Sequence, residues 1–183
     1  NLNDGISLIN VVEGALNEQS GAVIRLKELA TQGSSETLGA SERQTLNLEI
    51  ASLVAEIDRI AATTEFNSRT LLDGSLAQSV QASEQIFIQI GTDSQSASRI
   101  NLNTELNISA SNSTQLGINN LSVSTCKDAQ SALDDIATAL ETLNFARGGA
   151  GAVQNRFVKS LGTLTVAIQN LTAADSTLRD ADI

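Results

Sequence analysis

The sequence predicts a mainly α-helical, elongated fold: a bundle of three long coiled-coil-like helices with a small β-hairpin region. Apolar residues alternate at spacings of three and four from residue 126 to residue 178, which is typical of a coiled-coil seam. A helix of that length would be roughly 80 Å long, whereas a compact domain of this size has a radius of gyration of only about 16 Å. The chain also contains no proline, the residue that most strongly breaks a helix. We therefore expect a rod, and rods are usually parts of assemblies.

Composition narrows the class of protein. The 183 residues carry a net charge of −10, which makes nucleic acid and anionic membranes poor partners. No apolar run approaches the length of a membrane span. The sequence contains no histidine and one cysteine, so we expect no metal site and no histidine-dependent catalysis. No other catalytic constellation is visible, and we expect neither a cofactor nor an enzyme.

We expect one elongated rod domain over 1–183, which begins with a helical hairpin. The first helix is predicted over 4–33, with Gly33 as its C-cap. Its seam consists of Ile9, Val12, Leu16, Gln19, Val23, Leu26 and Ala30. The second helix is predicted over 41–64, and a capping box from Ser41 to Gln44 opens it. Its seam consists of Leu46, Ile50, Leu53, Ile57 and Ile60.

The middle third, 66–124, loses the helical periodicity and is rich in polar residues. The Asp73-Gly74 pair predicts a turn. Strand-like runs over 86–90 and 99–102 flank a loop that begins with Gly91-Thr92-Asp93, which predicts a β-hairpin. A weaker extended segment is predicted over 118–123. Apolar residues recur in short groups throughout, so we expect this region to be folded rather than a disordered linker.

A long final helix is predicted over 125–180. One set of seam positions reads Cys126, Leu133, Leu140, Arg147, Gln154, Leu161, Ile168 and Asp175. The interleaved set reads Ala129, Ile136, Leu143, Ala150, Phe157, Leu164, Leu171 and Leu178. Polar seam residues commonly fix helix register, so we expect Arg147 and Gln154 to set the register and Phe157 to pack beside them.

Three glycines at 148, 149 and 151 interrupt the composition of this helix but not its heptad phase. We therefore predict one continuous helix through the glycines rather than two helices joined by a loop. The alternative, a phosphate-binding loop, is disfavoured because no Lys-Ser/Thr pair follows the glycines in register and a helix, not a strand, precedes them.

Short segments in both helical arms resemble bacterial flagellins. They are NDGIS (3–7), EGAL (13–16), RLKELATQ (25–32), EIDRI (56–60), FN (66–67), LLDG (71–74), QIG (89–91), GAVQNRF (151–157) and DAD (180–182). The resemblance implies a structural subunit of the extracellular bacterial flagellar filament, used for motility, whose partners are other flagellin subunits. It further implies that this chain is the rod-like core fragment, without the terminal helices that line the filament channel.

The resemblance also implies recognition by the flagellin-sensing Toll-like receptor of innate immunity. The positions that match the receptor-contacting pattern are Arg25, Leu29, Glu49 and Ile136. Arg25 and Leu29 share a helix face and lie off the seam, so we expect both to be exposed. Ile136 lies on the seam, where a core position is the simpler interpretation.

Two alternatives stay open at this point. Arg25 and Glu49 could contact neighbouring subunits of a filament instead of a receptor. The whole chain could instead be a secreted coiled-coil adhesin or binding module that engages a host receptor.

Overall fold

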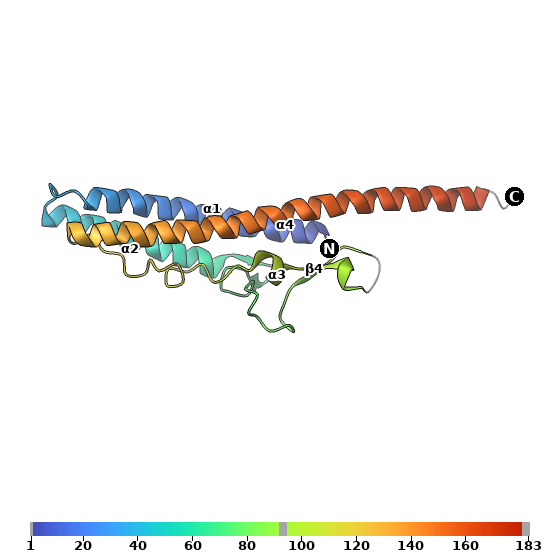
Figure 1. The fold of residues 1–183 in the computed structure, drawn as a ribbon, viewed down its shortest axis with the longest axis horizontal. Coiled ribbons are helices and arrows are strands. Elements are labelled where there is room, and N and C mark those ends of the chain that lie inside the picture. The colour runs from blue at the N-terminus through green and yellow to red at the C-terminus, as the bar shows by residue number, and fades with distance from the viewer. Residues whose placement is uncertain (1, 92–94, 181–183) are drawn as a thin grey trace.

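The computed structural model describes residues 2–91 and 95–180 and forms a long rod (Figure 1). Helices α1 (Leu2–Gly33) and α2 (Ala40–Thr63) form an antiparallel hairpin. Helix α4 (Cys126–Asp180) runs back along α1 and continues well beyond the N-terminal end of α1. The mainly α-helical, elongated fold class is confirmed.

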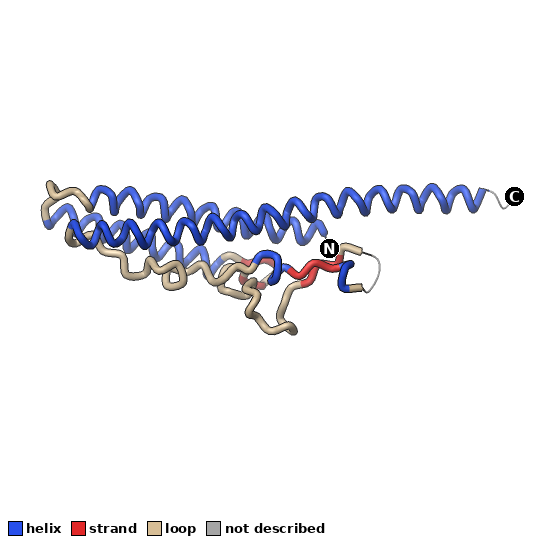
Figure 2. The backbone as a smooth tube through the Cα atoms, in the orientation of Figure 1, coloured by secondary structure: helices blue, strands red, loops and turns tan. Residues whose placement is uncertain are grey.

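The middle third contains short elements on one side of the helices (Figure 2). The strands are β1 (Glu65–Phe66), β2 (Arg69–Thr70), β3 (Phe87–Gln89) and β4 (Arg99–Asn101), and the short helices are η1 (Ser96–Ser98) and α3 (Leu102–Leu106). β3 and β4 pair antiparallel, with Ile88 opposite Ile100, which confirms the predicted hairpin. Its turn residues 92–94 lie outside the described residues. The segment 118–123 is not a strand.

Two tight turns in this region depend on unusual backbone angles. Gly74 has φ 99°, and the Asp73 carboxylate accepts a hydrogen bond from the Ser75 backbone amide at 2.9 Å, so the predicted turn is confirmed. Asn67 and Ser68 both have positive φ, 51° and 62°, between β1 and β2. Such angles at both central residues are those of a tight two-residue hairpin turn, which the sequence analysis did not predict.

The α1 seam is confirmed, because all seven of its predicted residues are buried. The predicted α4 seam is only partly right. Its second set is buried from Ala129 to Phe157, but its first set is half-buried from Cys126 to Leu161 and exposed beyond. The second buried column is instead Ala132, Ala139 and Val153. The second buried column is therefore displaced by one residue from the predicted one, toward the smaller side chains of Ala132 and Ala139. Leu178 lies outside the described side chains.

Helix boundaries correct two further expectations. Gly39 is the N-cap of α2 and no side chain caps this end, so the capping box predicted at Ser41 is wrong. Gly33 does end α1, but its φ is not positive. A Cβ added to Gly33 would lie 2.7 Å from Cβ of Val123, so glycine is required here by close packing. Helix α4 runs unbroken through Gly148, Gly149 and Gly151, which confirms the predicted continuous helix.

Candidate functional site

A charged cluster joins the exposed faces of α1 and α2. Arg25 Nε donates to Glu49 Oε1 at 2.9 Å, and Arg25 Nη1 donates to Glu28 Oε2 at 2.8 Å. Two hydrogen bonds raise the pKa of the Arg25 guanidinium above its usual value: that to Glu28 has the larger effect and that to Glu49 the next. Both sides of the Arg25–Glu49 pair are about half exposed, at 50% and 42%. The cluster therefore presents a fixed, solvent-facing arrangement of charges across two helices.

The other two positions predicted for receptor contact are in the core. Leu29 is 2% exposed and Ile136 is 0% exposed. The expectation that Leu29 is exposed is wrong, because α1 packs against both α2 and α4 and buries a face wider than one seam. Ile136 occupies the core position that its place on the seam favoured. The structure thus brings Arg25 and Glu49 together at the surface and separates them from Leu29 and Ile136.

Of the three residues predicted to set register or packing, Gln154 and Phe157 contact α1. Gln154 Nε2 donates to Asn10 Oδ1 on α1 at 2.6 Å. Phe157 is fully buried, and a Cβ added to Gly5 would lie 2.9 Å from its ring, so the two fit closely. Arg147 is half-buried, and its Nε has no hydrogen-bond partner among the described residues.

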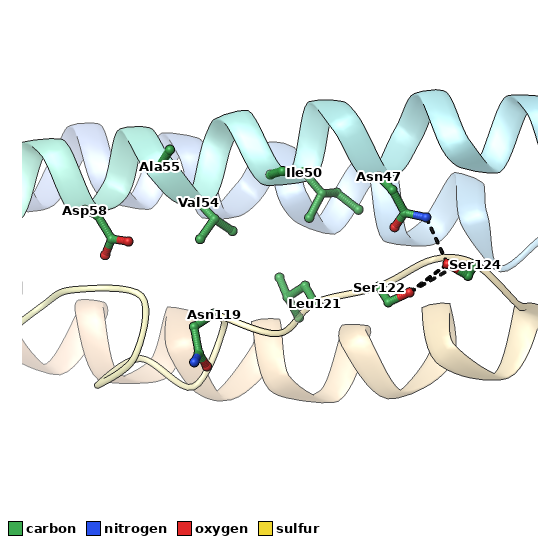
Figure 3. Close-up of a pocket in the computed structure, with 10 residues that line it drawn as sticks. Asn47, Ile50, Val54, Ala55, Asp58, Asn119, Leu121, Ser122 and Ser124 are labelled. Atoms are coloured by element: carbon green, nitrogen blue, oxygen red, sulfur yellow. Dashed lines mark hydrogen bonds between the residues drawn. The ribbon is translucent and has the colours of Figure 1, made fainter.

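A groove of about 610 Å³ runs between α2 and the segment that leads into α4 (Figure 3). Its walls are Asn47, Ile50, Ala51, Val54, Ala55 and Asp58 on one side, and Asn119, Leu121, Ser122 and Ser124 on the other. The Asn47 side chain crosses one end: its Oδ1 accepts from the Val123 amide at 2.9 Å and its Nδ2 donates to Ser124 Oγ at 3.1 Å. The groove contains no nucleophile–base pair. Among the described residues no cluster of acidic, cysteine and histidine side chains could hold a metal ion.

Polar residues hold the irregular segment 107–124 in place: Gln19, predicted only as a seam position of the first helix, and Asp58, which the sequence analysis did not single out. Gln19 is fully buried, and its Nε2 donates to the carbonyl oxygens of Ile57 at 3.2 Å and Ser111 at 3.0 Å. The Asp58 carboxylate accepts from the backbone amide and the hydroxyl of Ser113, at 2.7 and 2.8 Å. These side chains supply the hydrogen bonds that a strand would obtain from a neighbour.

Arg43 was also missed. It is 8% exposed and donates to three carbonyl oxygens: those of Gly33, of Ser35 at 2.7 Å and of Val123 at 3.1 Å. It therefore satisfies the end of α1 and joins the hairpin loop to the chain before α4. A signal was present, because a cation in the first turn of a helix is unfavourable unless it has another partner.

The far part of α4 is apolar and exposed. Val158, Val166, Ile168 and Leu171 are between 55% and 70% exposed. On one side, this part of α4 lines a mainly apolar groove of about 470 Å³ together with Leu2 and Ile90. No described helix is long and apolar enough to cross a membrane. Exposed apolar side chains on several sides of a helix are typical of one that packs against other chains or segments.

Comparison with known proteins gives consistent results. Residues 1–77 match the profile of the bacterial flagellin N-terminal helical region, and residues 133–183 match that of the C-terminal helical region. All of this chain aligns with 67% of the Bacillus subtilis flagellin at 32% identity, and with 63% of the Halalkalibacterium halodurans flagellin at 38% identity. It also aligns in full with 65% of the Treponema pallidum flagellin FlaB1, at 30% identity. The chain thus spans about two thirds of the length of these relatives.

The crystal structure of Bacillus cereus flagellin has the same fold. It superposes with a TM-score of 0.72 at 27% sequence identity, and covers 94% of this chain and 93% of that one. The described part of the DAD motif is limited to residue 180, since 181 and 182 lie outside the described residues.

Proposed function

Because this chain belongs to the bacterial flagellin family, a family of structural proteins, we propose that it is a structural subunit of the extracellular flagellar filament and serves motility. Its partners are other copies of the same flagellin. The observation that carries the proposal is the exposed apolar surface of the far part of α4, where Val166, Ile168 and Leu171, on different sides of the helix, are 55%, 63% and 70% exposed. Burying this surface against other copies stabilises an assembly by about 25 cal/mol per Å² of apolar surface.

The relatives match this chain over only part of their length, so we propose that the flanking segments of the gene product drive polymerisation. The test is electron microscopy of two purified proteins under filament-forming conditions: residues 1–183, and the product of the complete gene. We expect filaments only from the complete product. Failure of both, even with filament seeds, would favour the rival function of a secreted coiled-coil adhesin or binding module.

Within the subunit, we propose that Gln154 fixes the register of α4 against α1 and that Arg147 contributes to the same contact. Gln154 bonds Asn10 across the two helices at 2.6 Å, in register with the Phe157–Gly5 contact one turn further along. Substituting Gln154 or Arg147 by leucine should change filament shape or assembly, as seen by electron microscopy. Filaments of unchanged helical parameters from both variants would refute this role.

We also propose that the flagellin-sensing Toll-like receptor recognises the face that holds Arg25 and Glu49. The support is their exposure and their fixed geometry across α1 and α2. Leu29 and Ile136 are 2% and 0% exposed, so we propose that they support the packing of α1 and α4 rather than contact the receptor directly. Arg25→Ala should weaken receptor activation in a reporter-cell assay. The control is Arg59→Ala on α2, which should not weaken it; the Arg59 side chain is 58% exposed, against 50% for Arg25. Equal activation by both variants would refute the assignment.

A further inference from the structure

The irregular segment 107–124 lies between two long helices. Helix α1 packs extensively against both α2 and α4, whereas α2 and α4 make little direct contact in the described part of the chain. The segment crosses between α2 and α4 (Figure 3). Leu121 and Ser122 line both the groove against α2 and a second cleft, of about 150 Å³, against α4. The contacts of this segment can therefore be lost while both long contacts of α1 remain.

The first fastening of the segment, near residue 112, consists of the side chains of Gln19 and Asp58. Gln19 Nε2 donates to the Ser111 carbonyl oxygen at 3.0 Å. The Asp58 carboxylate accepts from the amide and the hydroxyl of Ser113, at 2.7 and 2.8 Å. The Leu72 carbonyl oxygen accepts from the Ser111 amide at 3.0 Å. These are single hydrogen bonds to separate groups rather than the continuous ladder of a helix or a sheet.

The second fastening, at Val123, consists of the side chains of Asn47 and Arg43. Asn47 Oδ1 accepts from the Val123 amide at 2.9 Å, and Arg43 Nη1 donates to the Val123 carbonyl oxygen at 3.1 Å. Between the two fastenings, the backbone hydrogen bonds of the described structure are internal to the segment, such as that from the Ile118 amide to the Ser113 carbonyl oxygen at 2.9 Å. Few hydrogen bonds therefore oppose release of this part from the helices.

The closed position of the segment also has unfavourable features. Gln19 Oε1 and Ser111 Oγ are buried and have no hydrogen-bond partner in the described structure. A buried polar atom without a partner is unfavourable, and water satisfies it once the segment lifts away. Open space borders the segment as well: Asn112 and Thr114 line a groove of about 370 Å³ beside α2, and residues 107–111 line another of about 230 Å³ beside α4. Side chains next to such space have fewer dispersion contacts.

We propose that segment 107–124 is a strap that opens as a unit while α1, α2 and α4 stay packed. Opening breaks both fastenings and uncovers the faces of α2 and α4 beneath the segment, and closing re-forms the described structure. The segment has the features of a locally unstable unit: hydrogen bonds at separate points, bordering grooves, and no strand or long helix of its own. This inference concerns the single subunit and does not depend on the proposed filament function.

Amide hydrogen exchange in the monomeric product of the complete gene tests the strap. The reporter amides are those of Ser111, Ser113 and Val123, because each donates to a group outside the segment and is protected in the closed position. We expect the reporter amides to exchange faster than the slowest amides of α1. Their exchange should also depend less on urea, because opening the strap exposes less surface than unfolding the rod.

Removing one fastening should accelerate exchange of the reporter amides. Asp58→Ala should do so by about 10- to 100-fold, the range for hydrogen bonds to a charged group. The matched control is Glu56→Ala, two residues away on the same helix, which removes only an exposed bond to Arg59 and should leave the reporter amides unchanged. Unchanged reporter amides in Asp58→Ala would overturn the strap. If Asp58→Ala does not fold, Asn47→Ala at the second fastening replaces it, with an expected acceleration of about 2- to 12-fold, the range for one neutral hydrogen bond.

A substitution in the core of α1 separates opening of the strap from unfolding of the whole rod. Ile9 is fully buried and lies ten residues, about 15 Å, along α1 from Gln19. Ile9→Val should accelerate the slowest amides of α1 by about 2- to 12-fold and leave the reporter amides unchanged. Equal acceleration of both sets would show that the segment is released only when the rod unfolds, and would overturn the strap. Reporter amides as slow as the slowest amides of α1 in the unsubstituted protein would do the same.

Discussion

Replacing Arg43 with alanine should destabilise one end of the rod far more than expected for a charged residue, which the sequence alone would place at the surface. Arg43 donates to the carbonyl oxygens of Gly33, Ser35 and Val123, and only 8% of the residue is exposed. No ion pair involves it among the described residues. Its guanidinium thus serves only to satisfy backbone groups at the meeting point of α1, the hairpin loop and the entry to α4.

The size of the effect follows from the groups left behind. Each buried carbonyl oxygen that loses its donor costs about 1–3 kcal/mol, less where water reaches it. With three carbonyls and partial access for water at the loop, the loss of stability should be about 3–5 kcal/mol. The stability of Arg43→Lys should lie between those of the unsubstituted protein and Arg43→Ala, because an ammonium group lacks the planar, forked donors with which the guanidinium serves three acceptors.

The assay is urea unfolding followed by circular dichroism at 222 nm. With a urea dependence of about 2–3 kcal/mol per M, the midpoint should fall by about 1–2 M. The control is Arg59→Ala on the same helix, whose ion pair with Glu56 is exposed at 58% and 46% and should contribute less than about 0.5 kcal/mol. Hydrogen exchange should accelerate at residues 30–46 and 120–126. Equal midpoints for the two variants would refute this account of Arg43.

Three further changes have defined outcomes. Phe157→Ala removes a fully buried ring and should lower the free energy of unfolding, measured in urea, by about 3–5 kcal/mol. The control Phe145→Ala, at a 77% exposed position, should lower it by less than about 0.5 kcal/mol. Similar losses for the two variants would contradict the assigned packing. Gly33→Ala introduces a Cβ only 2.7 Å from its nearest neighbour and should lower the free energy of unfolding in thermal denaturation by about 1–3 kcal/mol. The control Gly14→Ala has open space for its Cβ and should raise that free energy by up to about 1 kcal/mol. The reverse order would be inconsistent with the structure. Burial raises the pKa of Asp73, but hydrogen bonds from neighbouring hydroxyl and amide groups outweigh it and hold the pKa below its usual value. A lowered folded-state pKa adds stability above about pH 4, and this stability is lost as the pH falls through the folded pKa. Asp73→Asn should therefore reduce the change in the free energy of unfolding between about pH 5 and pH 2, by only a few tenths of a kcal/mol because Asp73 is exposed. An unchanged pH dependence would count against this role of Asp73.

The buried residues of the first helix were predictable because its apolar periodicity fits only one stripe. Ile9, Leu16 and Val23 recur on a single stripe, and the two long helices that cover α1 bury that stripe as a coiled coil does. Helix α4 was less predictable, because its second neighbour is the irregular segment 107–124 rather than a regular helix. Small residues such as Ala132 and Ala139 then face the core, and a seam search weighted toward leucine places the stripe one column away.

The surface cluster was predictable only in part for a related reason. Arg25 and Glu49 are charged and therefore exposed in almost any packing. Leu29 lies outside the seam columns, but α1 touches two helices at once, so its buried face is wider than two heptad positions. A pattern within one helix does not reveal how many neighbours that helix has. Leu29 is thus a core residue whose sequence position mimics a surface one.

Polar residues of α1 and α2 hold the irregular part of the middle third against the rod. Segment 107–124 has no strand partner, so Gln19, Asp58 and Asn47 bind its backbone directly and hold it between α2 and α4. That arrangement uses the inner faces of all three long helices. On the outer face of α4, from Asp134 to Lys159, Glu141 and Lys159 have no ion pair with any described residue, and Phe145 is 77% exposed. The side chains that take the place of a sheet ladder inside the subunit therefore come from the two helices of the N-terminal hairpin.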